Sequence, residues 1–496
     1  NNFSKYDFKK EEHQSLVMET YTSDFFNSIE ENKNFNNNKK KKKRIIIFSV
    51  LAVVFILFSA QAVSVYKLLN PKEPAPLSLE QQNFLEQSLN KKFPERADIV
   101  SELPFQYVPA DLFVNAESAI VIDFATGNIL FEKNADVQIP PASMTKLVEM
   151  YVVFEAVENG EISLDDVVPL PPESWARNLP SDASIMFLDE GQKVTLRELL
   201  LGLAIASGND ASIAVAKYVC GNMDSFVERM NQTVKKMGLV KTEFVESSGY
   251  SEKNITTAKE FSAFCRKYIE RFPFAITEFH SQKVLRYPLA KNLPRESAQR
   301  VGDSQAVIQY NTNKLLGSLE GCDGLKTGFI YESGFNIALT AERNGVRYIS
   351  VTMKGPGIGS AQGNIYRVKD GTNLMEYAFS KFSPYIAKRP HSFCVGVAGS
   401  SLKSVCLVPA KSENFSVPFI SGISPQEAAQ KIHVTANIPK SIFGEFEEGT
   451  QFGTLSYSLD GRVLNTVPLV ADRKSEKINF FARIWGALAY KISSLK

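Results

Sequence analysis

An apolar run without any charged residue extends from Ile45 to about Tyr66. Its length is enough for a helix to cross a membrane. Six basic residues, Lys39 to Arg44, precede it and favour a cytoplasmic location for that flank, so the chain beyond the run is expected outside the cytoplasm. The most hydrophobic part of the run, Ile45 to Phe58, also has the length of a signal-peptide core, and Ala60-Gln61-Ala62 resembles a cleavage site. We favour a retained transmembrane anchor at residues 45–66 over a cleaved signal segment.

The first 44 residues show no sustained apolar period and are rich in Asn, Lys and Glu. Such a composition buries too little apolar surface to fold, so residues 1–44 are predicted to be a disordered cytoplasmic tail. Residues 67–110 are predicted to be a linker with a stiff proline-containing spacer. An amphipathic helix is expected within this linker, around Leu79 to Leu89.

Residues 111–388 combine strand-like runs at both ends with helical periodicity between them. Turn signals at Ala125-Thr126-Gly127 and Asn344-Gly345 predict two hairpins. An antiparallel sheet packed against a helical cluster, which is an α+β fold, accounts for this pattern. The predicted strands are Ala119–Asp123, Asn128–Glu132, Phe335–Glu342 and Tyr348–Lys354, and the predicted helices run from Ser143 to about Glu158 and from Leu196 to Val219.

The end of the chain has a different character. Short β-prone pieces recur through residues 389–473 and predict a small β-sandwich domain. Residues 474–496 then place apolar side chains on one helical stripe with basic residues around it. This amphipathic helix is expected to lie in a membrane interface or to pack on the body, and we favour the interface. The stripe consists of Phe481, Ile484, Trp485, Leu488 and Ile492.

Composition narrows the possible partners. The 496 residues carry a net charge of +2 and no long basic face interleaved with aromatics, so nucleic acid is not an expected partner. The five cysteines form no Cys-x-x-Cys or Cys/His cluster, and no glycine-rich phosphate loop occurs, so no metal or cofactor is expected. Cys394 and Cys406 are able to pair in an oxidising compartment, but buried free thiols remain an equal alternative.

The candidate nucleophile is Ser143, followed three residues later by Lys146. A serine hydroxyl needs a base within hydrogen-bond reach, and a lysine three residues later lies on the same helical face. Lysine serves as a base only where burial or nearby positive charge lowers its pKa. Pro140 and Pro141 favour the start of a helix here, where the helix amides help to bind a developing oxyanion.

Two further motifs complete the set. Ser207-Gly208-Asn209 follows an apolar helix, where Ser207 is able to relay a proton and Asn209 to hold Lys146 and the substrate amide. Lys326-Thr327-Gly328 opens a β-prone run, where Lys326 and the Thr327 hydroxyl suit a carboxylate and Gly328 leaves room for a peptide. The four histidines lie outside these motifs, so a Ser-His-Asp hydrolase is disfavoured.

The order Ser-x-x-Lys, Ser-x-Asn and Lys-Thr-Gly is typical of serine acyl-transferases that bind penicillin. With its flanking phrases the chain resembles the low-molecular-weight penicillin-binding proteins that are D-alanyl-D-alanine carboxypeptidases, the serine peptidase S11 family. The resemblance is strong over Ser118 to Gly355 and looser over the β-rich region and the terminal helix. The phrases are Ile139 to Leu147, Ser207 to Ala211, Asn311 to Leu316 and Asp323 to Phe329.

The resemblance implies a penicillin-binding/β-lactamase-like domain in a bacterial cell membrane protein, with its site on the periplasmic side. It also implies removal of the terminal D-alanine from peptidoglycan stem pentapeptides through a Ser143 acyl-enzyme, with β-lactams as substrate mimics. Lys146 would accept the proton, and Ser207 and Asn209 would form the second element. Lys326, Thr327, Gly328 and Phe329 would bind substrate, and the amides of Ser143 and Phe329 would hold the oxyanion.

Some features depart from that family or leave alternatives open. Glu260 stands where many members have Asp, and the charged N-terminal tail is unlike a short cleaved signal. A class A-like β-lactamase uses the same three motifs plus a glutamate that activates water. Glu243 and Glu246 lie in the corresponding stretch, but no Glu-x-x-x-Asn pattern occurs there. A non-catalytic wall-binding scaffold is the other alternative, disfavoured by the intact Ser143 and Lys146.

Overall fold

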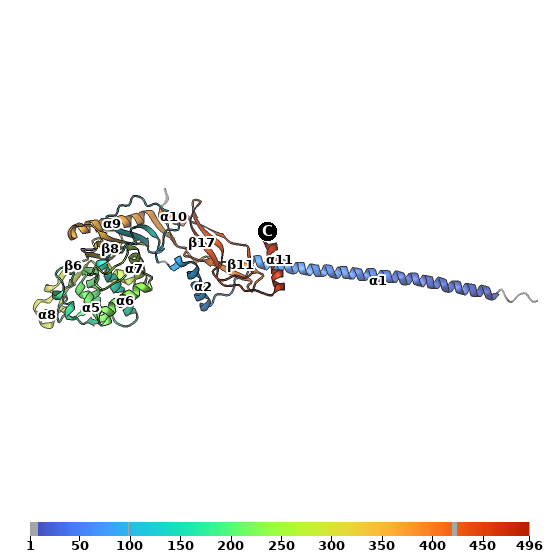
Figure 1. Cartoon of the computed structure of the whole chain (residues 1–496), viewed down its shortest axis with the longest axis horizontal. Coiled ribbons are helices and arrows are strands. Elements are labelled where there is room, and N and C mark those ends of the chain that lie inside the picture. The colour runs from blue at the N-terminus through green and yellow to red at the C-terminus, as the bar shows by residue number, and fades with distance from the viewer. Residues whose placement is uncertain (1–7, 98, 419–423, 496) are drawn as a thin grey trace, which may run out of the picture.

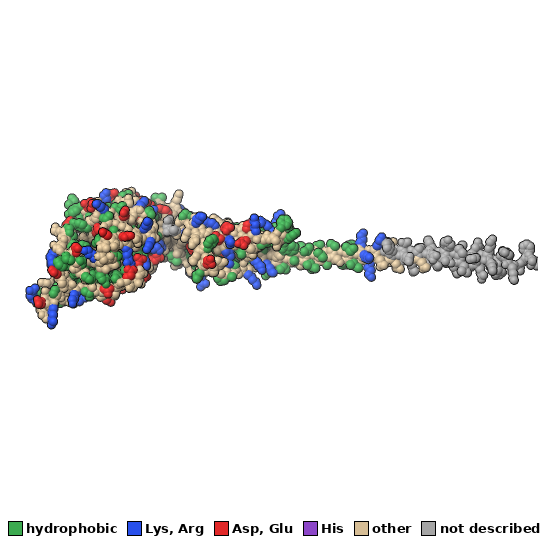
Figure 2. Space-filling view, turned by 60° about the horizontal axis from the view of Figure 1, so that its bottom comes forward, with side chains coloured by type: hydrophobic (Ala, Val, Ile, Leu, Met, Phe, Trp, Pro, Cys, Tyr) green, Lys and Arg blue, Asp and Glu red, His purple; other side chains and the backbone are tan. Residues whose placement is uncertain are grey.

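The computed structural model describes residues 8–97, 99–418 and 424–495. The molecule is elongated, with a helix-rich unit at one end, a β-rich unit in the middle and the long helix α1 (Phe8–Leu69) projecting from the other end (Figure 1). Within α1, Asn36–Leu69 contains an 18-residue stretch with a mean hydropathy of 2.6, and this segment is long and apolar enough to cross a membrane. Its hydrophobic side chains lie exposed along the projecting helix, next to a group of basic ones (Figure 2).

The polar tail differs from the predicted disorder of residues 1–44. From Phe8 onward it continues α1 without a break, while residues 1–7 lie outside the described residues. Nucleation is the costly step of helix formation, and the apolar segment supplies the nucleus. The preceding residues only need to propagate the helix, and Lys and Glu do so readily.

The helix-rich unit is built on a five-stranded antiparallel sheet with the order β2-β1-β9-β8-β7. Both predicted hairpins are present. Gly127 has a φ of 73° between the first pair of strands, and Asn344 and Gly345 have φ of 51° and 77° between β8 and β9. These left-handed angles match the twist of the flanking strands, which explains the Asn-Gly pair. The strands are β1 (Ser118–Asp123), β2 (Ile129–Lys133), β7 (Cys322–Ile330), β8 (Gly334–Arg343) and β9 (Val346–Gly355).

Helices cover both faces of this sheet. Along β1, Ile120 and Ile122 join the core shared with the helical cluster, whereas Ala119 and Val121 pack with helix α9 (Gly359–Lys381) on the other face. The predicted α+β class is confirmed. The helices of the cluster are α3 (Lys146–Glu158), α4 (Leu196–Leu201), α5 (Asn209–Cys220), α6 (Met223–Lys236), α7 (Ala258–Arg271) and α8 (Arg295–Val301), with the short strand pairs β3 (Val167–Val168) with β4 (Val194–Thr195) and β5 (Val284–Tyr287) with β6 (Val307–Tyr310).

The β-rich unit is a six-stranded sheet with the order β14-β16-β17-β12-β11-β15, closed over one core by the pair β10–β13. Strand β10 (Phe382–Tyr385) precedes the predicted boundary at residue 388 but pairs with β13 (Phe415–Pro418), so the two units meet at the end of α9. The other elements are β11 (Phe393–Ala398), β12 (Ser404–Pro409), β14 (His433–Asn437), β15 (Ser441–Phe443), β16 (Gln451–Leu459), β17 (Arg462–Ala471) and α10 (Pro425–Gln430).

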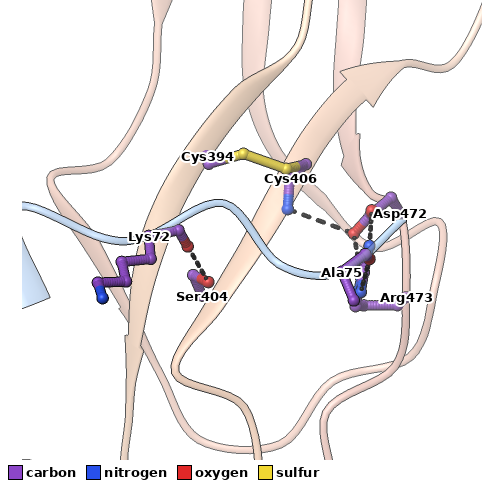
Figure 3. Close-up of a disulfide and its surroundings, with 7 residues drawn as sticks. All are labelled: Lys72, Ala75, Cys394, Ser404, Cys406, Asp472 and Arg473. Atoms are coloured by element: carbon purple, nitrogen blue, oxygen red, sulfur yellow. Dashed lines mark hydrogen bonds and ion pairs between the residues drawn. A yellow bond between two sulfur atoms is a disulfide. The ribbon is translucent and has the colours of Figure 1, made fainter. Parts of the chain in front are cut away.

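A disulfide and the proline-containing spacer stiffen the end of this unit that lies next to α1. Cys394 and Cys406 are register partners on β11 and β12, and their sulfurs are bonded (Figure 3). Nearby, the Ser404 hydroxyl donates to the carbonyl of Lys72 at 2.6 Å, and Arg473 donates to the carbonyl of Ala75 at 3.0 Å. The spacer therefore lies on the sheet, and α2 (Leu79–Lys92) follows it.

Helix α11 (Phe480–Ser494) lies across the C-terminal end of α1, next to the β-rich unit (Figure 1). The Trp485 indole donates to Ser64 Oγ at 3.2 Å, and the Gln61 side chain donates to the Trp485 carbonyl at 3.3 Å. Leu68 and Ala489 are buried in the same small cluster. The apolar stripe predicted for this helix is divided, since Trp485 meets α1 while Phe481 remains exposed.

Candidate active site

Ser143 and Lys146 lie at the start of α3, in the centre of the helix-rich unit. Ser143 belongs to a 3-10 turn, Ala142–Thr145, that runs directly into the helix. Lys146 Nζ is 3.1 Å from Ser143 Oγ. Ser143 is half-buried, whereas Lys146 is fully buried. The serine hydroxyl is thus reachable from outside, while the amine behind it is shielded from water.

Lys146 has three partners around Nζ. Besides Ser143 Oγ, the Asn209 side-chain oxygen lies at 2.8 Å and the Ser248 carbonyl at 2.5 Å. A neutral amine has two N–H donors and one lone pair. The two fixed acceptors use both donors, which leaves the lone pair for the Ser143 hydroxyl. Burial lowers the pKa of Lys146, and the negative charges of Glu149, Glu246 and Asp210 oppose this in that order.

Ser207 and Asn209 reach the site because the preceding helix ends in a π-helical turn, Gly202–Ala206. Ser207 then takes a left-handed conformation with φ 59°, and α5 starts at Asn209. Such turns and strained residues often occur at functional sites. Asp210 holds the break in place, since its carboxylate accepts from the backbone amides of Met186 and Leu188.

Lys326 projects from β7 toward the same place. Its Nζ is 3.0 Å from Ser207 Oγ and also donates to the carbonyl of Thr327 at 2.9 Å. Burial, then the charges of Lys146 and Arg367, lower the pKa of Lys326 well below its usual value. An incoming carboxylate would reverse this effect, because it favours the ammonium form.

Gly328 is required by close packing. A Cβ there would lie 2.5 Å from the Pro141 carbonyl and 3.1 Å from the Ser143 amide. The absence of a side chain lets β7 pack directly against the turn that carries the nucleophile. The Thr327 hydroxyl donates to Thr312 Oγ1 at 2.7 Å. Phe329 is partly exposed, and the centroids of the Phe329 and Phe335 rings are 4.5 Å apart.

The structure therefore brings together the residues singled out from the sequence. Ser143, Lys146 and Asn209 form one hydrogen-bonded group, and Ser207 with Lys326 forms a second. Ser207 and Asn209 lie on either side of Gly208 at the helix break, so the two groups are neighbours. Thr327, Gly328 and Phe329 continue along β7 beside them.

A loop that sequence reasoning did not assign to the site also supports it. Glu246 accepts hydrogen bonds from the backbone amides of Ser248 and Gly249, each at 2.7 Å, and so fixes the loop whose Ser248 carbonyl binds Lys146. Gly249 has φ 79°, and a Cβ there would lie 1.9 Å from the Ala142 carbonyl. The only signal in the sequence was the turn-like Ser247-Ser248-Gly249, which does not indicate what the turn contacts.

Glu260 and the histidines make other contacts. Glu260 accepts from the Lys241 amide at 2.9 Å and from the Thr242 hydroxyl at 2.6 Å, which fixes a turn. His280 is buried with Nε2 2.7 Å from the Tyr268 hydroxyl, and burial lowers its pKa to about 3. Among histidines whose side chains the structure describes, none is hydrogen-bonded to Ser143.

Comparison with known proteins gives consistent results. The family model described as D-alanyl-D-alanine carboxypeptidase matches residues 106–357, about half of the chain. D-alanyl-D-alanine carboxypeptidase DacF of Bacillus subtilis is 28% identical over 371 residues, which cover 75% of this chain and 88% of DacF. D-alanyl-D-alanine carboxypeptidase DacD of Escherichia coli is 32% identical over 285 residues, which cover 57% of this chain and 67% of DacD.

Solved structures resemble both folded units. Penicillin binding protein 5 of Haemophilus influenzae superposes with a TM-score of 0.60 at 26% identity, covering 75% of this chain and 100% of that protein. Penicillin binding protein 6B of Escherichia coli superposes with a TM-score of 0.57 at 26% identity, covering 75% of this chain and 99% of that protein.

Proposed function

The chain belongs to the D-alanyl-D-alanine carboxypeptidase family, and from this premise we propose how its site residues divide the reaction. It is a serine-type D-alanyl-D-alanine carboxypeptidase of cell-wall metabolism. The observation that carries the proposal is the contact of 3.1 Å between Ser143 Oγ and the shielded amine of Lys146. A hydroxyl and a base at this separation are the two parts that nucleophilic catalysis requires.

In the first step Ser143 Oγ attacks the carbonyl carbon of the penultimate D-alanine of a peptidoglycan stem pentapeptide. The new C–O bond forms as the hydroxyl proton moves to the neutral amine of Lys146. The negative charge passes to the carbonyl oxygen, which the backbone amides of Ser143 and Phe329 stabilise. Gly328 supports this arrangement, since it lets β7 approach the nucleophile turn closely.

In the second step the C–N bond breaks and the terminal D-alanine leaves with its nitrogen protonated. Ser207 relays that proton from Lys146 to the leaving nitrogen, while Asn209 holds Lys146 in position. Lys326 binds the carboxylate of the leaving D-alanine, assisted by the Thr327 hydroxyl. The carboxylate raises the lowered pKa of Lys326 on binding, so the clamp becomes charged when substrate arrives.

Water then hydrolyses the acyl-enzyme and restores Ser143. A β-lactam acylates the same hydroxyl, but its leaving nitrogen remains tethered to the acyl group. A β-lactamase would need a carboxylate free to activate water on this ester. Glu246, one of the two candidates from the sequence, instead accepts hydrogen bonds from the amides of Ser248 and Gly249. Slow release of the acyl group from a β-lactam follows.

The assignment is tested on the unmodified protein with a labelled penicillin and with a stem pentapeptide. We expect one label per chain, located by mass spectrometry on the tryptic peptide that contains Ser143, and release of one D-alanine per pentapeptide. We also expect the label to persist far longer than one pentapeptide turnover. Rapid turnover of the penicillin without D-alanine release would instead identify a β-lactamase, and an unlabelled chain would identify a scaffold.

We further propose that α1 anchors the enzyme in the cell membrane through residues 45–66, with the folded units on the periplasmic side. We also propose that α11 lies at the membrane–water interface on the periplasmic face of that membrane. The basic cluster before the apolar segment favours this orientation. On α11, Phe481, Ile484 and Leu488 remain exposed where the helix crosses α1, as expected for side chains that enter lipid.

The contacts at the end of α1 support retention of the segment. Gln61 and Ser64 exchange hydrogen bonds with Trp485, and Leu68 packs so closely on β11 that a Cβ at Gly396 would lie 2.0 Å from the Leu68 carbonyl. Cleavage after Ala62 would remove Gln61 and cut the helix within this contact. The end of α1 therefore belongs to the folded unit that α11 completes.

Retention predicts a specific mature protein. Intact-mass analysis of protein extracted from membranes should show that residues 45–66 are present, and Ala62→Leu, which removes the small residue before the cleavage point, should leave mass and membrane association otherwise unchanged. A mature form that starts at Val63, converted to a longer form by Ala62→Leu, would show that the segment is a cleaved signal.

A further inference from the structure

Glu149 is a fully buried carboxyl group in α3, one helical turn after Lys146. Its Oε2 accepts a hydrogen bond of 2.8 Å from the Ser212 hydroxyl. Its Oε1 is buried and has no hydrogen-bond partner among the residues that the structure describes. Burying an acid with half of its acceptors unpaired destabilises a fold, so such a group invites a functional explanation.

A short polar network joins Glu149 to the base. Ser212 Oγ lies 2.7 Å from Ser247 Oγ, and the next residue, Ser248, accepts the hydrogen bond from Lys146 through its carbonyl. Residues three apart on a helix are also direct neighbours on its surface, so Lys146 and Glu149 face the same side of α3.

Three carboxyl groups act on Lys146, and two of them have structural tasks. Asp210, on α5, accepts from the Met186 and Leu188 amides, and Glu246 accepts from the amides of its own loop. Glu149 accepts no backbone amide in the described part of the chain, and its charge is the largest of the three influences on Lys146. On β7, Lys326 also faces the site, and burial holds its pKa well below its usual value.

We propose that Glu149 is a positioning residue whose buried charge keeps Lys146 basic enough to take the proton of Ser143. The inference rests on the proposed function of Ser143 and Lys146. Without a negative charge nearby, burial leaves a weakly basic amine. With Glu149 ionised, transfer of the proton from Ser143 Oγ to Nζ turns an amine–carboxylate pair into an ammonium–carboxylate pair. The positive charge created on Lys146 is therefore balanced within the site.

The two groups titrate together. Burial raises the pKa of Glu149, and the charge of Lys146 opposes that rise. As pH falls, Glu149 gains a proton and Lys146 becomes an ammonium, so acylation declines. In Glu149→Gln the shape is kept but the charge is lost, which removes an influence that raises the pKa of Lys146. In a plot of acylation rate against pH, the decline on the acid side (the acid limb) then moves to lower pH. The constant rate reached at higher pH (the plateau) is lower, because the base is weaker.

The test is the rate of acylation by a labelled penicillin as a function of pH, measured on the full chain. For Glu149→Gln we expect the midpoint of the acid limb to fall by about one pH unit, the lower end of the range for a neighbouring charge, and the plateau rate by about tenfold. Glu149→Asp keeps the charge at a poorer fit and should restore the limb to within a few tenths of a unit of the wild type. Glu155→Gln is the matched control, since Glu155 lies on the same helix but pairs with Arg271 at the surface, and should leave the profile unchanged.

The outcomes separate the two proposals. If the wild-type chain is not labelled at Ser143, the proposed function is wrong. If it is labelled but Glu149→Gln keeps the wild-type midpoint, Glu149 does not tune Lys146. A purely structural role would lower the thermal midpoint of unfolding in Glu149→Gln and Glu149→Asp alike and leave the acid limb in place, and that result also overturns the inference.

Discussion

Replacing Ser143 by alanine is expected to reduce D-alanine release and penicillin labelling to background, a loss of roughly 10⁴-fold or more. The substitution removes the atom that forms the acyl bond, and no other residue can substitute for it. The Lys146 amine lies behind Ser143 and is fully buried, so it cannot reach the carbonyl carbon in its place. Folding should be unaffected, because within the described part of the chain the hydrogen bond of Ser143 Oγ is to Lys146 alone.

The measurement is D-alanine release from a stem pentapeptide together with gel detection of the labelled penicillin. Ser174→Ala is a matched control, because Ser174 is buried in the same unit and its hydroxyl donates only to the Pro171 carbonyl. We expect that variant to retain wild-type labelling. D-alanine release that persists in Ser143→Ala while Ser174→Ala behaves normally would show that another residue is the nucleophile.

The sequence predicted the parts of the site that depend on local spacing. Ser143 and Lys146 meet because three residues span one helical turn, and Lys326 and Gly328 share a face because strand residues alternate. The two hairpins were equally predictable, since Asn344-Gly345 requires a left-handed turn wherever it occurs. These features could be predicted because each depends only on residues a few positions apart in the sequence.

Contacts between distant segments were not predictable in this way. The Ser248 carbonyl binds Lys146 from 102 residues away, and Asp210 fixes the amide of Met186 across a helix break. A backbone carbonyl carries no sequence signature, and an aspartate that caps a distant loop looks like any polar residue. The burial of Glu149 could not be predicted either, because a glutamate within a helix normally indicates an exposed position.

The ends of the chain show how packing decides between alternatives that sequence leaves open. Cys394 and Cys406 became partners because β11 and β12 place them in register, which the 12-residue spacing alone does not require. The predicted amphipathic helix packs on α1 through Trp485, while Phe481 is exposed, so the interfacial interpretation stays a prediction for the exposed face. The pairing of β11 with β12 and the packing of α11 on α1 determine these contacts, and neither can be read from the order of residues in the chain.

Replacing Lys146 by methionine is expected to lower the rate of penicillin acylation by about 10²–10⁴-fold, the usual contribution of a general base. Methionine fills similar volume, and Ser143 remains in place. The Asn209 side-chain oxygen and the Ser248 carbonyl lose their donor, which destabilises the fold. Removal of a buried amine acts in the other direction, so the variant should remain folded.

The pH dependence of stability distinguishes these two effects. Because burial lowers the pKa of Lys146, the unfolded chain binds this proton more tightly than the folded one. The penalty on the wild type is therefore complete below the lowered folded pKa and disappears as pH rises to the ordinary lysine value of about 10.4. Relative to the wild type, Lys146→Met should be most stable near neutral pH and lose that advantage above about pH 10, as measured by urea unfolding.

Lys146→Arg separates proton transfer from charge at the same position. Arginine keeps a positive charge but is never deprotonated in a protein, so it cannot take the proton of Ser143. We expect penicillin to acylate Lys146→Arg as slowly as Lys146→Met at every pH, whereas the acylation rate of the wild type rises with pH as the amine becomes neutral. If penicillin acylates Lys146→Arg at the wild-type rate, position 146 contributes charge alone and another base activates Ser143.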